Sequence, residues 1–162
     1  MNAASGIILL RPDDSARAAR LHQASFPAEE VWSANSMQSA IELTSTLSVG
    51  LEQAGHLVGL LLVQKTPPDA EILTIAVDPS HRRKGYAQTL LDHARNLLGG
   101  HGIDRLLLDV AADNKPAIAF YTRNGFEQDG LRRSYYPREG GAAVDAVLMS
   151  RKLAGQIEES KA

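Results

Sequence analysis

The sequence contains no cysteine. This absence excludes a disulfide framework, a zinc–thiolate site and a thiol nucleophile. Long apolar runs are also missing, and none approaches the roughly 18 residues that a membrane-spanning helix needs. Residues 1–10 carry no basic residue ahead of their short apolar run, so they do not resemble a secretory signal peptide. We therefore expect a cytoplasmic protein that does not associate with membranes.

An excess of charge of one sign is also absent. The chain has 17 basic and 19 acidic residues, a net charge of −2, which argues against a globally basic protein that binds nucleic acid directly. The distribution is uneven, with 4 basic and 9 acidic residues before Arg82 and 13 and 10 from Arg82 onward. Either the second half binds an anionic group such as a phosphate, or the charges cluster by chance on solvated surfaces.

The length and composition favour a single domain. With 162 residues, 44% of them hydrophobic, the chain is long enough for one sizeable core and short for two. We expect this domain to span residues 7–153, followed by a polar tail over residues 154–162.

Hydrophobic periodicity predicts a mixed α/β (α+β) fold. The clearest helix covers residues 85–98, where apolar residues form one stripe and two glycines follow. Other helices are expected within residues 12–26, after Ser33, and between Asn114 and Gly125. Together with the strands, they predict a mixed, mostly antiparallel sheet of six or seven strands, flanked on both faces by about four helices. Expected strands cover residues 7–10, 47–53, 56–65, 70–77, 106–110, 126–135 and 144–153.

The stretch after the strand at residues 70–77 has the features of a phosphate-binding loop. A helix starts at Gly85 directly after three cations, Arg82, Arg83 and Lys84. Free backbone N–H groups at a helix N-terminus bind phosphate well, and a glycine lets the ligand approach the backbone. Neither the P-loop pattern nor the GxGxxG pattern occurs here. The alternative is an ordinary basic helix start on a solvated surface.

Two segments together resemble the GNAT N-acetyltransferases. Arg82-x-x-Gly85-x-Ala87 is similar to their acetyl-CoA pyrophosphate loop, and residues 114–126, NKPAIAFYTRNGF, are similar to their second characteristic segment. The resemblance implies a GNAT fold and acetyl-CoA as co-substrate. The implied contacts with acetyl-CoA are the backbone of Ile75, Ala76 and Val77, the loop residues Arg82, Arg83, Lys84, Gly85, Tyr86 and Ala87, and Asn114.

A narrower resemblance is to the RimI-type ribosomal-protein alanine N-acetyltransferases. It lies in residues 132–137, RRSYYP, followed by DAVLM at residues 145–149. By position, the family's proton acceptor falls on Asp109 and its proton donor on Tyr121. The implied acceptor is the N-terminal alanine of a ribosomal protein. The chain departs from that pattern with an aspartate in place of the usual glutamate, and with five residues, 28–32, in place of a tryptophan directly after Pro27.

The chemistry of these side chains agrees with the implied roles. A carboxylate within a strand of leucines is partly desolvated, which suits a base that takes a proton from an amine. The alternative for Asp109 is a structural pair with an arginine such as Arg105. Ala117 lies one helical turn before Tyr121, so this small residue leaves room for a pantetheine arm. The alternative for Tyr121 is a packed core tyrosine.

The remaining candidates concern the acceptor. Tyr135 and Tyr136 either hold a peptide N-terminus or are packing residues, and Glu29 either attracts a cationic acceptor, as Glu30 and Glu139 would, or is simply solvated. The five histidines lack metal-ligand spacing, so we expect no metal and interpret all five as structural or exposed. Direct transfer in a ternary complex is expected because no cysteine can carry the acetyl group. The alternatives are a small-amine or lysine acetyltransferase, or a non-catalytic acyl-CoA-binding module.

Overall fold

The computed structural model describes residues 5–153, so the predicted tail at residues 154–162 lies outside the described part. The first half of the chain supplies four strands and two helices. A short 3-10 turn precedes the first helix, because Pro12 and two aspartates favour a helix start there. These elements are β1 (Gly6–Leu9), α1 (Ser15–Ser25), α2 (Ala34–Glu42), β2 (Thr46–Gln53), β3 (His56–Thr66) and β4 (Asp69–Val77).

The second half alternates helices and strands. Its elements are α3 (Tyr86–Leu98), β5 (Arg105–Ala111), α4 (Lys115–Arg123), β6 (Glu127–Tyr136) and β7 (Val144–Lys152). The helix α3 ends at Leu98, as expected, and the chain continues through the two glycines as a 3-10 turn, after which Gly102 adopts the left-handed conformation. Asn114 caps α4 as expected, with its side chain accepting a hydrogen bond from the Ala117 N–H at 3.2 Å.

The seven strands of the described residues form one sheet in the order β1-β2-β3-β4-β5-β7-β6. Only β4 and β5 pair in parallel, and every other neighbouring pair is antiparallel. Four α-helices accompany this sheet, so the predicted mixed, mostly antiparallel sheet with about four helices is confirmed. None of the helices among residues 5–153 is long and apolar enough to cross a membrane.

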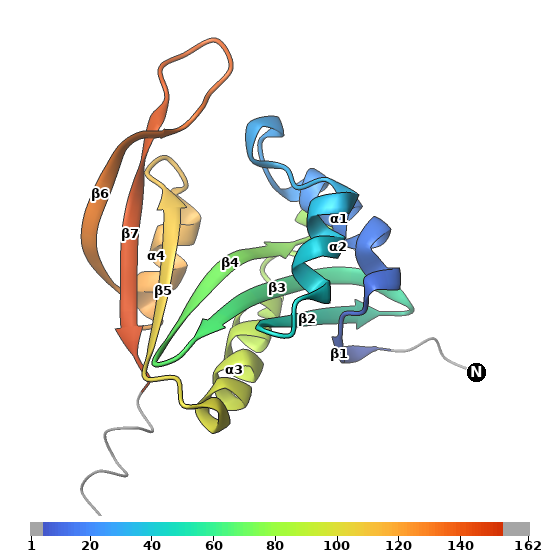
Figure 1. Cartoon of the computed structure of the whole chain (residues 1–162). Coiled ribbons are helices and arrows are strands. Elements are labelled where there is room, and N and C mark those ends of the chain that lie inside the picture. Colours follow the sequence, from blue (N-terminus) through green and yellow to red (C-terminus); the bar gives the residue numbers. More distant parts are fainter. Residues whose placement is uncertain (1–4, 154–162) are drawn as a thin grey trace, which may run out of the picture.

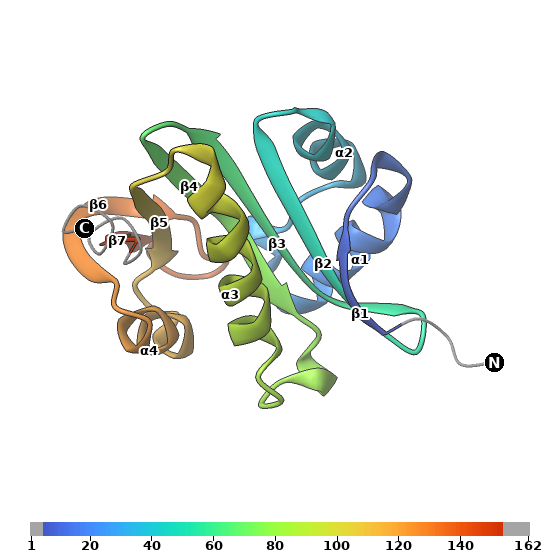
Figure 2. The ribbon, with the colours of Figure 1, turned by 90° about the horizontal axis from the view of Figure 1, so that it is seen from below.

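The helices cover the sheet from both sides (Figures 1 and 2). The apolar stripe of α3 is buried in the larger core cluster, which also contains the inner residues of β5 and β7 and Tyr121 of α4. On the opposite face, α1 and α2 bury Leu21, Met37 and Ile41 against β3 and β4 in a second cluster. Removing this apolar surface from water is the main force that holds the helices on the sheet.

The centre of the sheet is open at one end. Residues 69–72 of β4 pair with residues 105–108 of β5, but the rest of the two strands have no ladder between them. Figure 1 shows β4 and β5 diverging beyond this point. The register of β4 against β3 also shifts by one residue at Leu73, which is a β-bulge. Among the described residues, no strand therefore pairs with the edge of residues 74–77 that faces away from β3.

Candidate active site

A cleft of about 470 Å³ lies beside the open end of the sheet, between the end of β4, the N-terminus of α3 and the side of α4. Most of the residues for which the sequence predicted acetyl-CoA contacts come together here. They are Ile75, Ala76, Val77, Arg82, Arg83, Gly85, Tyr86, Ala87, Asn114 and Ala117.

The loop into α3 leaves its first backbone N–H groups available. Gly85 is the N-cap residue, with φ of 78° and no side chain to cap the helix. Arg82 is held against the strand end, because its Nε donates a hydrogen bond to the Val77 carbonyl at 3.2 Å. The helix N-terminus therefore faces the cleft with unsatisfied donors and a positive dipole end, which suits an anionic group.

The cations of the cleft differ in part from the predicted set. Arg82 and Arg83 line it, but Lys84 is exposed in the same loop and is not among the lining residues. Arg123, in the last turn of α4, lines the cleft instead. Sequence reasoning missed Arg123, although it lies seven residues after Pro116 and hence two turns along the same helix face.

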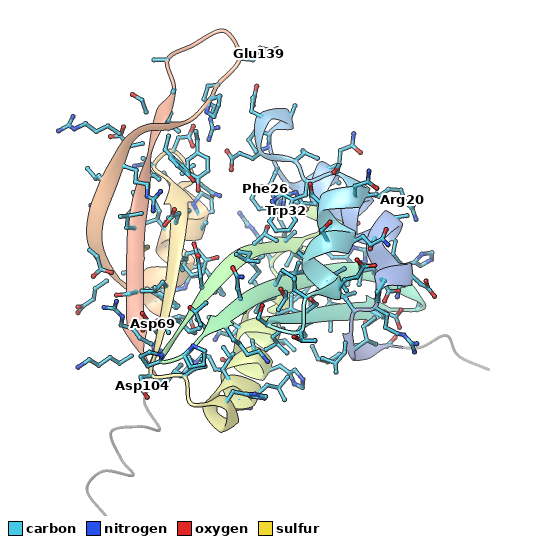
Figure 3. All side chains as sticks on the ribbon, in the orientation of Figure 1. Arg20, Phe26, Trp32, Asp69, Asp104 and Glu139 are labelled. Atoms are coloured by element: carbon cyan, nitrogen blue, oxygen red, sulfur yellow. The ribbon has the colours of Figure 1, made fainter. Side chains whose placement is uncertain are left out.

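A second cavity of about 220 Å³ lies in the gap between β4 and β5. Side chains from the end of α1 and from the α1–α2 loop close one side of it. Figure 3 shows Phe26 and Trp32 between the α1–α2 part of the molecule and the β5–β7 part. The cavity and the cleft share residues of their walls, so the two spaces meet at the open end of the sheet. The shared residues are Phe26, Ile75, Asn114, Ala117 and Tyr121.

Asp109 lines this second cavity from β5. Its carboxylate lies 3.9 Å from Nε of Arg132, with 23% of the Asp109 side chain exposed. The alternative pair with Arg105 is wrong, because Arg105 lies 3.8 Å from Asp69 at the far end of the strand. A contact at 3.9 Å to a half-exposed arginine is weak. Burial and the nearby Asp109 carboxylate raise the pKa of Glu71, a carboxyl group that sequence reasoning missed.

Tyr121 lines both spaces and is 4% exposed. Its ring packs edge-on against Phe120 and Phe126, with centroids 5.3 and 5.4 Å away. Burial raises the pKa of its hydroxyl, so the group holds its proton at neutral pH. Among residues 5–153 its hydroxyl makes no hydrogen bond. The tyrosine is therefore a packed core residue that also lies on the wall of both spaces.

The two consecutive tyrosines at the end of β6 lie in different surroundings. Tyr136 lines the second cavity, and burial, together with the Asp109 and Glu30 carboxylates, raises its pKa to about 12. Tyr135 is 48% exposed and does not line either space, so it is not brought into the site. Its ring lies under the guanidinium of Arg132 at 5.3 Å.

One arginine ties together three loops around the second cavity. Arg138, in the β6–β7 loop, lies 2.8 Å from the Glu30 carboxylate of the α1–α2 loop and binds Asp113 of the β5–α4 loop. The next backbone N–H, that of Glu139, donates to Glu29 at 3.1 Å. Glu29 and Glu30 therefore line the cavity as residues of a closed rim, and Arg138 neutralises Glu30. Sequence reasoning missed Arg138.

His22 is the one histidine that lines the second cavity among the described residues, and it is 1% exposed. The other four lie elsewhere, although His81 contributes to the wall of the cleft. Within residues 5–153, no group of three or more histidine, aspartate or glutamate side chains is arranged to hold a metal ion.

The family model described as "Acetyltransferase (GNAT) family" matches residues 15–126. This chain belongs to the GNAT acetyltransferase family. Its members use acetyl-CoA for acetyl transfer, and the cleft fits that molecule: unsatisfied helix N–H donors and three arginines suit its phosphates, and the unpaired edge of β4 suits its amide-bearing arm.

Similar proteins include N-terminal acetyltransferases. The [ribosomal protein bS18]-alanine N-acetyltransferase of Escherichia coli is 36% identical over 64% of this chain and 70% of its own length. The N-alpha-acetyltransferase RimI of Mycobacterium tuberculosis is 34% identical over 85% of this chain and 86% of its own. An uncharacterized Mycobacterium leprae protein, ML0378, is 37% identical over 88% of this chain, which spans only 39% of that protein's length.

The solved structures agree with these relationships. The crystal structure of the ribosomal-protein-S18-alanine N-acetyltransferase from Escherichia coli superposes with a TM-score of 0.84 at 31% identity, covering 93% of this chain and 94% of that one. Ard1 from Thermoplasma volcanium superposes with a TM-score of 0.80 at 26% identity, covering 93% and 99%. The resemblance to RimI-type enzymes that the sequence suggested is therefore confirmed at the level of family and fold.

Proposed function

We propose that this protein transfers the acetyl group of acetyl-CoA to the N-terminal α-amine of a polypeptide, with the N-terminal alanine of a ribosomal protein as the leading candidate. The observation that carries the proposal is that the α3 cleft adjoins the smaller cavity, with Tyr121 on the wall of both spaces and Asp109 on the wall of the smaller cavity. The named activities of the similar Escherichia coli and Mycobacterium tuberculosis enzymes support the choice of acceptor.

Acetyl-CoA occupies the α3 cleft in this proposal. The N-terminal N–H groups of α3, with Arg82, Arg83 and Arg123 around them, hold its phosphates. Ile75 and Val77 lie on the unpaired edge of β4, whose backbone groups hydrogen-bond its amide-bearing arm as a neighbouring strand would. When bound, it supplies a thioester carbonyl at the junction of the two spaces.

Asp109 accepts the proton that the acceptor ammonium group must lose before its nitrogen can form a bond to the acetyl carbon. Its side chain is one methylene shorter than the glutamate usual in RimI-type enzymes, so we place one water between the carboxylate and the amine. A base that acts through one water is still within the reach that general-base catalysis requires.

Tyr121 donates its hydroxyl proton toward the sulfur as the carbon–sulfur bond breaks. The raised pKa keeps this hydroxyl protonated, and its position on the wall of both spaces puts it beside the reacting groups. The acceptor nitrogen loses two protons in all: Asp109 takes the first, and the second, released as the tetrahedral intermediate collapses, returns to the Tyr121 oxygen that gave its proton to sulfur. Asp109 then passes its proton to solvent, so the protons balance.

The cavity favours a small first residue on the acceptor. Its volume of about 220 Å³ is limited by Phe26, Trp32 and Tyr136, whose rings stand around it. An N-terminal alanine fits such a space better than a bulky residue. The contacts of Arg138 with Glu30 and of the Glu139 N–H with Glu29 hold the β6–β7 loop beside the α1–α2 loop at this cavity.

Acetyl transfer to peptides, read by mass spectrometry, tests the proposal. One peptide copies the bS18 N-terminus with a free N-terminal alanine and no lysine, and a matched peptide has a blocked N-terminus and one internal lysine. Acetylation of the first alone supports the proposal. Acetylation of the second alone makes the protein a lysine acetyltransferase, and binding of acetyl-CoA without transfer to either peptide favours small amines or a non-catalytic role.

A further inference from the structure

His22 is a buried side chain to which the proposed mechanism gives no role. It lies in α1 with 1% of its surface exposed, stacked on Phe26 at 4.3 Å between ring centroids. Its Nε2 is 2.8 Å from Oγ1 of Thr74, and its Nδ1 is 3.3 Å from the backbone nitrogen of Trp32. Burial lowers its pKa to about 4, so the ring is neutral at physiological pH.

The two contacts fix which ring nitrogen carries the hydrogen. The Trp32 backbone N–H can only donate, so Nδ1 of His22 is the acceptor of that bond. The single hydrogen of the neutral ring is therefore on Nε2, which donates to Thr74 Oγ1. Thr74 accepts in this pair, and its own hydroxyl hydrogen is left to point elsewhere.

Thr74 has a free donor at the wall of the smaller cavity. The residue is 8% exposed and lines that cavity, but it is not among the residues that line the α3 cleft. Within residues 5–153, its hydroxyl takes part in no hydrogen bond besides the one with His22. A buried hydroxyl without an acceptor is costly, so a ligand in the cavity that offers an oxygen gains by supplying one.

The position of Thr74 on β4 points to the acceptor as that ligand. Side chains two residues apart share a face of a strand, so Thr74 lies with Ala76, which packs in the α1–α2 core cluster. Ile75 and Val77 point to the opposite face and pack against the α3 cluster. The Thr74 side chain is therefore on the α1–α2 face of the sheet, and it lines the smaller cavity, which is the acceptor site of the proposed function, and not the α3 cleft.

We propose that Thr74, oriented by His22, donates a hydrogen bond to the carbonyl oxygen next to the acceptor's amine and so selects α-amines. This inference rests on the proposed function and names the pair of residues that gives it specificity. An N-terminal residue has its carbonyl one carbon away from the amine, whereas a lysine side chain or an alkylamine has no carbonyl within that distance. An acceptor without this oxygen leaves the buried donor unpaired, which is the arrangement that discriminates strongly between substrates.

Two isomeric acceptors test the inference on the intact protein. One peptide begins with alanine, and the other begins with β-alanine, which has the same composition but moves the carbonyl one carbon farther from the amine. The variants are Thr74→Val, which keeps the shape and removes the donor, Thr74→Ser, which keeps the donor, and His22→Phe, which keeps the ring stack and removes both hydrogen bonds. The readout is kcat/KM for each peptide and the ratio between the two.

We expect Thr74→Val to lower kcat/KM for the alanine peptide by roughly tenfold. The kcat/KM for the β-alanine peptide should change by less than about threefold. Thr74→Ser should keep the wild-type ratio, and His22→Phe should reduce the ratio because the hydroxyl loses its orientation. A loss of fold stability lowers both rates together and leaves the ratio unchanged, so the ratio separates positioning from folding.

The possible failures are distinguishable. If wild type acetylates the alanine peptide and Thr74→Val lowers both peptides equally or neither, the inference is overturned and the proposed function stands. If wild type acetylates only lysine side chains or small amines, both are overturned. A β-alanine peptide that is as good an acceptor as the alanine peptide in wild type also overturns the inference.

Discussion

Arg138 donates two nearly parallel hydrogen bonds to the Asp113 carboxylate, from Nε at 3.0 Å and from Nη2 at 2.9 Å. The remaining terminal nitrogen lies 2.8 Å from Glu30, so one planar guanidinium joins three loops. The hydrogen bonds and the charge of Asp113, together with Glu30, raise the pKa of Arg138, so it stays charged. Charge-assisted bidentate pairs of this kind fix geometry as well as contribute energy.

Arg138→Ala should therefore loosen the rim of the acceptor cavity. We expect the KM for the peptide acceptor to rise roughly fivefold, since correctly positioned binding groups are lost, while the KM for acetyl-CoA stays unchanged. Steady-state kinetics with each substrate varied in turn measures both values. Arg133→Ala, an exposed arginine five residues earlier, is the matched control. A rise in the acetyl-CoA KM alone would contradict this assignment of Arg138.

Asp109→Asn should remove the proposed base with little change of shape. The expected loss is about 100-fold in turnover, the size typical of a general base, with both KM values nearly unchanged. Asp109→Glu restores the longer side chain and should retain activity. Asp129→Asn, an exposed aspartate on β6, serves as the control for a general effect of charge. Wild-type turnover in Asp109→Asn would show that Asp109 is a structural residue.

Tyr121→Phe should slow the breaking of the carbon–sulfur bond. The ring contacts with Phe120 and Phe126 persist, so stability should change little, while turnover falls by about 10- to 100-fold because the proton donor is gone. Thermal unfolding and turnover are measured on the same preparation. Tyr135→Phe removes the hydroxyl of the exposed tyrosine and should leave turnover unchanged. Equal activity of both variants would leave Tyr121 as a packing residue.

The arginines of the cleft should govern affinity for acetyl-CoA. Arg83→Ala combined with Arg123→Ala is expected to raise the dissociation constant of acetyl-CoA by roughly tenfold or more, because two charge-assisted contacts with phosphate are lost. Isothermal titration with acetyl-CoA, in the absence of an acceptor, gives this value without turnover. Lys84→Ala removes a cation from the same loop but from outside the cleft lining, and it should have a smaller effect. A larger loss of affinity in Lys84→Ala than in the double arginine variant would mean that the phosphates lie on the outer side of the loop.

His22 should make the fold sensitive to mild acid. Its pKa is about 4 in the folded state and near 6.5 when unfolded, so between these values the unfolded state binds more protons. The stability contributed by the neutral ring is complete above pH ~6.5 and is lost as the pH falls toward 4, by up to ~3 kcal/mol. Urea unfolding at pH 7 and pH 4.5 measures the loss. His22→Phe should show a smaller difference between the two pH values.

The sequence was most informative where one short segment determines one local structure. The stripe of α3, the cap at Asn114 and the glycine at position 85 depend on neighbours within a few residues, and the structure has all three where the sequence placed them. The family motifs lie in these same segments, so the α3 cleft could be anticipated almost residue by residue.

The features that the sequence did not reveal join distant segments. The Glu139 N–H and the Glu29 carboxylate are 110 residues apart, and His22 and Thr74 are 52 apart. No periodicity or spacing records such a contact, because each partner by itself resembles an ordinary loop acid or core polar residue. The length of the unpaired segment of β4 likewise depends on where β5 ends its ladder, which is a property of the whole sheet.

The short ladder between β4 and β5 has a consequence for how the two substrates bind and the two products leave. In the proposed reaction, a polypeptide end in the smaller cavity approaches the thioester through the gap between β4 and β5, while the nucleotide part of acetyl-CoA lies at the N-terminus of α3. Because the proposed function gives the two substrates separate spaces, we expect CoA to leave the cleft while the acetylated chain is still in the smaller cavity.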